Sequence, residues 1–312
     1  MTAPKNLKSS FNVSAVRNFL RLSLLSATLL AAGGLGYNTW KNNYSAEPVE
    51  SVPPTPVVSV ERQEARLQQW HENWRDMCVI PGREEPQATS QRSIRDALKE
   101  MEREEVVGVG LVKAIKDAGT AICVDPAPGN RVSYYSDSWN TIFLRRNLNN
   151  NHTLLQITHE ARRVMQKDQG MLGRIKLSDT HQRLRLDFAL EADVAATTTL
   201  MAWRLYQQGR GDLWNQLRSS TLYSDLPTAF TGAMLSTKDE KAATLAVFER
   251  WYARETRMAD AYRERKHVTF MAGTDRRELP TYEMVPQGYF NRLGELPDGT
   301  NYGANKSPML RR

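Results

Sequence analysis

The spacing of apolar residues changes along the chain and separates helical segments from a short region of strands. Through most of the chain, apolar residues recur every three or four positions, which is typical of amphipathic helices. Helices are predicted over residues 61–77, 93–105, 106–118, 154–167, 187–208 and 238–266. Short apolar runs bounded by turn residues predict strands over residues 120–125, 132–136 and 140–146. The pattern therefore predicts an α+β, mainly α fold, with a small sheet preceding the helix at 154–167.

The composition of the chain changes at the end of the predicted folded domain, which covers residues 61–272. After Gly273 the residues Gly, Pro and Asn become frequent and apolar positions become few. We therefore expect residues 273–312 to form a loosely packed C-terminal tail.

The N-terminal region contains a long uncharged segment, residues 22–40. At 1.5 Å per residue this segment reaches about 28 Å as a helix, close to the hydrocarbon thickness of a bilayer. Basic residues precede it, which favours a cytoplasmic segment 1–21 and export of the rest of the chain. The segment is either an uncleaved signal anchor or a cleaved signal peptide with residues 22–30 as its apolar part. A buried core helix is a third interpretation, which the glycines at 33, 34 and 36 disfavour.

Export determines the expected location of the domain. With an anchor, the protein spans the inner membrane once and places the domain in the periplasm, whereas with a cleaved signal it is secreted. The Pro-rich residues 41–60 show no helical periodicity and are predicted to be an extended linker between membrane and domain.

The charge of the chain gives no indication of nucleic-acid binding. The formal net charge is +7, from 42 Lys and Arg against 35 Asp and Glu. The first 42 residues hold five basic residues and no acidic residue, which leaves only +2 for everything after them. A nearly neutral domain lacks the basic surface that DNA or RNA binding needs, so we expect no nucleic-acid partner.

Cysteine usage is compatible with export. The chain has two cysteines, Cys78 and Cys123. They can form a disulfide in an oxidising compartment, or remain as two buried thiols. Neither lies in a CxxC pattern, which excludes a zinc-finger site.

The segment ITHEARRVMQ, residues 157–166, carries the most specific chemical signal. A zinc-peptidase helix has two histidines one turn apart, with a glutamate after the first that deprotonates the metal-bound water. His159 and Glu160 occupy the first two of these positions, but Arg163 occupies the position of the second histidine. A guanidinium is always protonated and cannot ligate a metal. The motif is therefore degenerate.

A second helix supplies a candidate for the remaining ligand. In glutamate-type zinc peptidases the third ligand is a carboxylate from a later helix that packs on the first. The sequence LEADVAA, residues 190–196, offers Glu191 and Asp193 among alanines, which allow two helices to approach closely. An ordinary Ala-rich packed helix with surface acids is the alternative. His152 or His181 are the other candidates for a replacement ligand.

Together these segments resemble a known family. The Tyr-rich turn, NTIFL, LLQITHEARRVMQ, EADVAATTTLMAWRLYQQG and FERWYARETRMADAY are similar to the bacterial putative metallopeptidase family catalogued as domain of unknown function 6782. The resemblance covers roughly residues 93–262. It implies a zincin-like helical domain that hydrolyses peptide bonds with zinc.

The resemblance also implies roles for particular residues. His159 would bind zinc, Glu160 would act as general base, and Glu191 would be the third ligand. Asp193 would replace Glu191 or support it. In addition, Arg162 and Gln166 match the Arg and Gln of the family pattern.

Arg163 departs from the pattern at the position that matters most for metal binding. Residues four apart lie on the same side of a helix, so the Arg163 side chain should point to where the metal would lie. It could instead pair with Glu191 or Asp193 and bridge the two helices. The first hypothesis is therefore a metallopeptidase-like protein that is weakly active or inactive. The second is a non-catalytic cell-envelope protein that holds a peptide or protein partner in the same cleft, and a third is an unrelated helical envelope protein.

Overall fold

The fold was determined as a computed structural model, which describes residues 59–83, 88–126, 131–172, 180–257 and 287–310. All of them belong to one compact unit, Val52–Arg312. The predicted segments 1–21 and 22–40 and nearly all of the linker lie outside the described residues. Within the residues that are described, none of the helices has the length and apolar character needed to cross a membrane.

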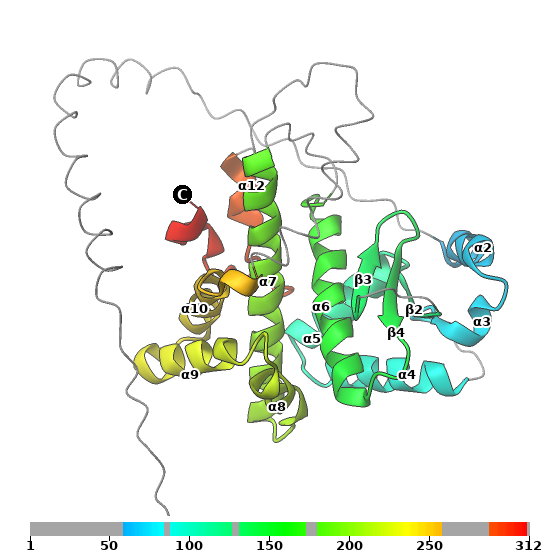
Figure 1. Cartoon of the computed structure of the whole chain (residues 1–312), viewed down its shortest axis with the longest axis horizontal. Helices are drawn as coiled ribbons and strands as arrows, with labels where there is room; N and C mark the ends of the chain where they lie inside the picture. Colours follow the sequence, from blue (N-terminus) through cyan, green and yellow to red (C-terminus); the bar gives the residue numbers. More distant parts are fainter. Residues whose placement is uncertain (1–58, 84–87, 127–130, 173–179, 258–286, 311–312) are drawn as a thin grey trace, which may run out of the picture. The chain divides into compact units, whose positions relative to one another are not determined.

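Helices make up most of the described structure, with one small mixed sheet (Figure 1). The strands are β1 (Cys78–Val79), β2 (Ala121–Asp125), β3 (Ser133–Ser136) and β4 (Thr141–Arg145). The helices are α2 (Val60–Trp70), α3 (Trp74–Met77), α4 (Thr89–Glu102), α5 (Val107–Asp117), α6 (Asn150–Asp168), α7 (Thr180–Gln207), α8 (Asp212–Ser219), α9 (Asp225–Thr237), α10 (Glu240–Tyr252) and α12 (Gln287–Arg292). The predicted α+β, mainly α class is confirmed, and the sheet precedes α6 as expected.

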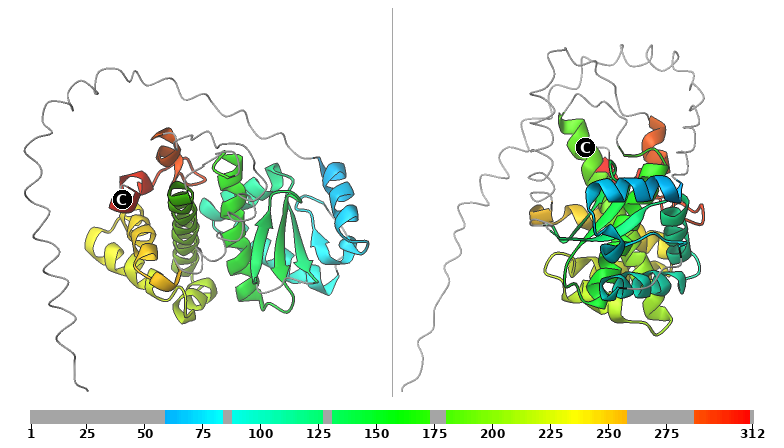
Figure 2. Two further views of the ribbon diagram at one scale, coloured as in Figure 1. Left: turned by 45° about the horizontal axis from the view of Figure 1, so that its top comes forward. Right: turned by 90° about the vertical axis from the view of Figure 1, so that its right-hand side faces the viewer.

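The sheet has the order β1-β2-β4-β3, which places β3 at one edge. The central strands β2 and β4 are parallel, and β1 and β3 pair antiparallel with them. Side chains alternate between the two faces of a strand, and both faces are covered here. Ile122 and Ile142 pack into the main core with α4, α5 and α6, whereas Phe143 packs into a smaller core with α2 and α3. Figure 2 shows the sheet between α2 on one side and α6 on the other.

The two cysteines form a disulfide. Cys78 and Cys123 are directly opposite each other in the β1–β2 pair, and both side chains are buried. Of the two alternatives for the cysteines, the structure has the disulfide. The bond fixes the N-terminal strand to the centre of the sheet.

The predicted helix over 61–77 is wrong, because the chain forms two helices there. After α2 ends at Trp70, His71 takes an extended conformation with φ −157°. The backbone N–H of Asn73 donates to His71 Nδ1 at 3.0 Å. This local side-chain hydrogen bond replaces a helical one and lets α3 start in a new direction.

A second correction concerns the predicted helix over 238–266. The helix α10 spans Glu240–Tyr252 and is followed by a break at residues 253–254, after which residues 255–257 are helical again, while residues 258–286 lie outside the described part. Lys238 has φ 55° and forms the turn between α9 and α10. Neither α8 nor α9 is predicted from the sequence, and both pack beside α7 (Figure 1).

The expectation of a loose tail is wrong for the described residues 287–310. Tyr289, Leu293, Leu296, Tyr302 and Leu310 are all buried and belong to the main core. Apolar residues are sparse in this segment, but most of those present face inward. The folded domain therefore includes this C-terminal segment.

Candidate functional site

The predicted site residues lie where α6 and α7 pack together beside the edge strand β3. The helix α6 begins at a side-chain cap, in which Asn149 accepts a hydrogen bond from the backbone N–H of His152. One side of α6 packs against the sheet and against α4 and α5, and another packs against α7. The helix is therefore held on several sides, which fixes the direction of its side chains.

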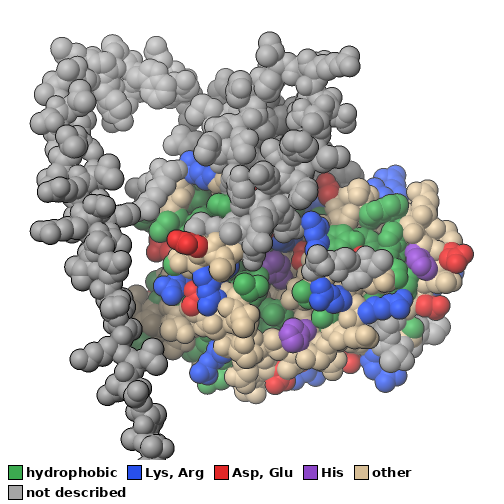
Figure 3. All heavy atoms as spheres, viewed as in Figure 1, with side chains coloured by type: hydrophobic (Ala, Val, Ile, Leu, Met, Phe, Trp, Pro, Cys, Tyr) green, Lys and Arg blue, Asp and Glu red, His purple; other side chains and the backbone are tan. Residues whose placement is uncertain are grey.

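A cleft of about 780 Å³ opens between α6, α7, β3 and the α8–α9 loop. Its lining includes His159, Glu160, Arg163 and Glu191. The structure thus brings together the residues that the sequence selected from two helices. Figure 3 shows histidine and Lys or Arg side chains among apolar ones on the face of the molecule that it draws.

Glu160 is buried and held by neighbours on both of its oxygens. Ser133 Oγ on β3 donates a hydrogen bond to Glu160 Oε1 at 2.7 Å, and Arg163 Nε lies 3.3 Å from Oε2. Burial alone would raise the pKa of Glu160, but Arg163, His159 and Ser133 together lower it to about 2. A carboxylate with such a pKa is a poor proton acceptor near neutral pH.

Arg163 connects the two helices of the site. Its NH2 group donates to Glu191 Oε1 on α7 at 2.5 Å, while its Nε approaches Glu160 on α6. The side chains of Arg163 and Glu191 are both mostly buried, with 22% and 17% exposed. The predicted helix-to-helix ion pair is present, and its partner is Glu191 rather than Asp193.

His159 faces the cleft with its imidazole close to Glu160. The distance from Nδ1 to Glu160 Oε1 is 3.6 Å, beyond a hydrogen bond. His159 Nδ1 is buried and makes no hydrogen bond in the described structure. A metal-binding histidine normally has its second nitrogen held by a hydrogen bond, which fixes the orientation of the ring. That support is missing here among the described residues.

The residues present do not fit a zinc ion. Within the described residues, no group of three His, Cys, Asp or Glu side chains could hold a metal. Arg163 brings a fixed positive charge between the two carboxylates that would face the ion. His152 is not a replacement ligand, because its ring nitrogens contact Asn149 Oδ1 and Gln216 Nε2 at 3.0 Å each.

Two other histidines can be placed only in part. The side chain of His181 and the whole of His267 lie outside the described residues. Asp193 is described, and it is not available to a metal.

Asp193 belongs to a buried cluster whose residues do not line the cleft, with Arg162 and Gln166 from α6 and Tyr302 from the C-terminal segment. Arg162 binds both Asp193 oxygens, with Nε at 2.8 Å and NH2 at 3.1 Å. Gln166 Nε2 and the Tyr302 hydroxyl each donate to Asp193 at 2.8 Å. Arg162 NH1 also donates to the Glu295 carbonyl oxygen at 2.8 Å. The cluster joins α6, α7 and the C-terminal segment, so its role is structural.

The cleft walls are partly apolar. Val132, before β3, and Leu222, in the α8–α9 loop, are among the exposed large apolar side chains, with 36% and 40% exposed. Leu155, Leu226 and Trp251 line the cleft more deeply. None of these residues was selected from the sequence, because their role depends on the α8–α9 loop, which carries no chemical motif.

The outer edge of β3 also lines the cleft. The backbone N–H of Arg145 on β4 donates to the carbonyl oxygen of Val132. In an antiparallel pair of strands, residue pairs that are hydrogen-bonded alternate with pairs that are not, so Ser133 and Tyr135 belong to the pairs that are not. Ser133 and Tyr135 therefore direct their backbone N–H and C=O groups away from β4. No described strand pairs with this edge.

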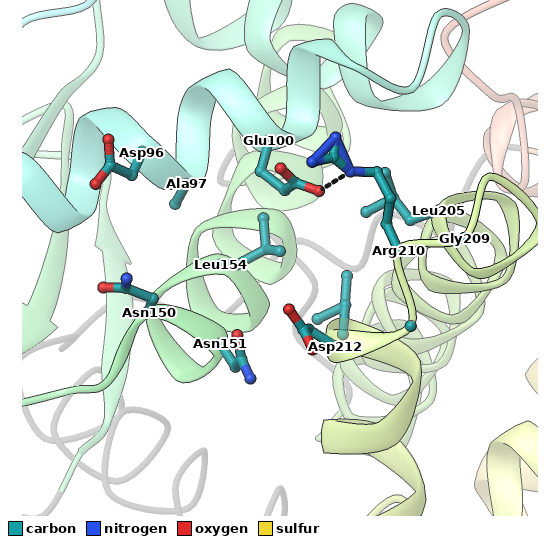
Figure 4. A pocket seen from close by; sticks show the side chains of 12 residues that line it. Asp96, Ala97, Glu100, Asn150, Asn151, Leu154, Leu205, Gly209, Arg210 and Asp212 are labelled. Carbon is teal, nitrogen blue, oxygen red and sulfur yellow. Dashed lines mark ion pairs between the residues drawn. The ribbon is translucent and has the colours of Figure 1, made fainter.

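A second pocket, of about 370 Å³, lies between α4, the start of α6 and the α7–α8 turn (Figure 4). Its polar side chains include Asp96, Asp212 and Glu100, and Glu100 forms an ion pair with Arg210 Nε at 2.7 Å. None of the predicted site residues lines it. The larger cleft is therefore the candidate site.

The fold and cleft define a mainly helical α+β protein with a peptidase-like His-Glu helix. The putative metallopeptidase family, domain of unknown function 6782, matches residues 64–304. The chain belongs to this family, which indicates a peptidase-like function. No curated protein and no solved structure matches the chain.

Proposed function

We propose that this protein is a non-catalytic member of its family that holds an extended polypeptide in the cleft without cleaving it. The observation that carries the proposal is the position of Arg163 between Glu160 and Glu191. A guanidinium links the two helices as a bridging cation but cannot activate water as zinc does. On this proposal the zincin-like arrangement is kept for binding and the chemistry is lost.

The cleft has the features that an extended polypeptide requires. An exposed strand edge gives main-chain hydrogen bonds to an added strand, and adjacent pockets accept alternate side chains. The outer edge of β3, with which no described strand pairs, supplies the first feature. Val132, Leu222 and the deeper apolar residues supply the second.

The proposed location is the periplasmic side of the inner membrane, with residues 22–40 as anchor, or outside the cell if that segment is cleaved. The Cys78–Cys123 disulfide supports export, since such bonds persist in oxidising compartments. The family description names a metallopeptidase without naming the metal, and zinc is the metal that the His-Glu motif of α6 suggests. We propose that this chain does not use it.

The absence of zinc binding and of peptidase activity is tested by zinc titration calorimetry and by an assay for cleavage of labelled casein. We expect the metal-stripped full-length protein to bind no zinc tightly and to cleave nothing. Arg163→His places an imidazole one turn after His159 and should create one-to-one zinc binding. A further Glu191→Ala change should remove that binding. Tight zinc binding by the unmodified protein, lost on Glu191→Ala, would contradict the proposal, and zinc-dependent cleavage of casein would show a metallopeptidase instead.

The test of polypeptide binding uses fluorescence anisotropy with labelled, unfolded β-casein. Leu222→Asp places a charge on the apolar wall and should weaken binding at least about tenfold. Leu235→Asp is the matched control, because Leu235 on α9 is 78% exposed and does not line the cleft. Equal effects of the two changes would contradict binding in the cleft.

A further inference from the structure

Three arginines converge on one carboxylate beside the cleft. Arg250 Nε lies 3.0 Å from Asp225 Oδ2, Arg254 NH1 lies 3.6 Å from Asp225 Oδ1, and Arg257 NH2 binds the same Oδ1. We call Arg250, Arg254 and Arg257 the arginine cluster. One carboxylate against three guanidiniums leaves two positive charges without an acidic partner among these ion pairs.

Arg257 brings this excess charge to the cleft. It lines the cleft, and its side chain is only 3% exposed. Its Nε is buried and has no hydrogen-bond partner in the described structure. Burial lowers the pKa of Arg257, and Arg254 lowers it further, so Asp225 compensates the group only in part. Arginine nevertheless stays protonated, so an anion is the ligand that such a buried donor favours.

The surrounding groups are also hydrogen-bond donors. Arg254 NH1 donates to the Thr221 carbonyl oxygen at 2.6 Å and so fixes the α8–α9 loop next to Arg257. Tyr223 in that loop also lines the cleft, and its hydroxyl is protonated at neutral pH and able to donate.

We propose that the arginine cluster binds a carboxylate of the polypeptide held in the cleft, from an acidic side chain or from the chain's C-terminus. The inference rests on the proposed function and adds to it a preference for polypeptides with a carboxylate at this position. The apolar walls hold the extended chain, and Arg257 selects a segment with a carboxylate at this end. Planar guanidinium and carboxylate groups match in geometry, which makes the selection specific as well as electrostatic.

The experiment compares three labelled decapeptides by fluorescence anisotropy with the full-length protein. They share a backbone of Val, Thr and Ser. The first has a central Glu and an amidated end, the second has Gln in its place, and the third has Gln and a free C-terminal carboxylate. We expect a carboxylate peptide to bind about tenfold more tightly than the amidated Gln peptide. The peptide that shows the gain identifies the source of the carboxylate.

Two variants separate recognition from support of the fold. Arg257→Met should remove the preference, while Arg218→Met, an exposed arginine that does not line the cleft, should keep it. Asp225→Asn removes the internal competitor and should increase the preference. If the arginine cluster only supports the fold, Asp225→Asn should not increase the preference for carboxylate peptides. This variant therefore tests carboxylate recognition even if Arg257→Met does not fold.

The outcomes are distinguishable. Equal binding of all three peptides overturns this inference and leaves the proposed function standing. Failure of every peptide and of β-casein to bind overturns both.

Discussion

Replacing Asp193 with Asn tests whether this residue is structural or belongs to a metal site. The side chains of Asp193 and Arg162 are both 0% exposed and form two charge-assisted hydrogen bonds. The neutral amide leaves the Arg162 guanidinium buried without a counter-charge, which typically costs about 3–5 kcal/mol. It also loses acceptor capacity toward Gln166 and Tyr302.

The assay is urea unfolding of the full-length protein at pH 7, followed by circular dichroism. Glu191→Gln is the matched comparison, because it also neutralises one α7 carboxylate paired with an α6 arginine. Arg163 keeps Glu160 as a second counter-charge, and the pair is not completely buried, so we expect a loss of only about 1 kcal/mol. If Asp193→Asn destabilises the protein no more than Glu191→Gln, the structural reasoning fails. The double change Arg162→Met with Asp193→Leu should cost less than Asp193→Asn, because no buried charge remains.

Two further predictions concern the disulfide and pH. Replacing Cys78 and Cys123 with alanine opens a loop with a sequence separation of 45 and should lower the unfolding free energy by about 4 kcal/mol. Reductant should destabilise the unmodified protein and leave this variant unchanged in thermal melts. The folded pKa of Glu160, about 2 against 4.5, predicts about 3 kcal/mol of stability that is present above pH 4.5 and lost as the pH falls toward 2. The stability gap between the unmodified protein and Glu160→Gln, measured by urea unfolding, should close over that interval, and a pH-independent gap would contradict the assignment.

The elements with strong periodicity were predictable, and the errors have physical causes. The strands β2 and β4 are uninterrupted apolar runs because both of their faces are covered. By contrast, α9 carries apolar residues on several sides, so its sequence shows no clear helical stripe. The break after Trp70 depends on a hydrogen bond between His71 and Asn73, which apolar spacing does not encode.

Only those features of the candidate site that follow from residue spacing along a helix could be predicted from the sequence. Arg163 lies one turn after His159, so its approach to α7 followed from spacing. Spacing did not predict that Arg163 pairs with Glu191 rather than Asp193, because this depends on Arg162, which already binds Asp193. Ser133 comes from another element, and no local pattern marks its contact with Glu160.

The neighbouring arginines on α6 show how one helix separates stability from function. Arg162 is completely buried and satisfied by Asp193 and by backbone, so the packing of α6 on α7 does not depend on the site. Arg163 lines the cleft and shares its charge between Glu160 and Glu191. Because the Arg162 cluster already joins the helices, position 163 can change without loss of the fold. On the proposed function, this independence explains how a peptidase-like scaffold loses a metal ligand and keeps a cleft for binding.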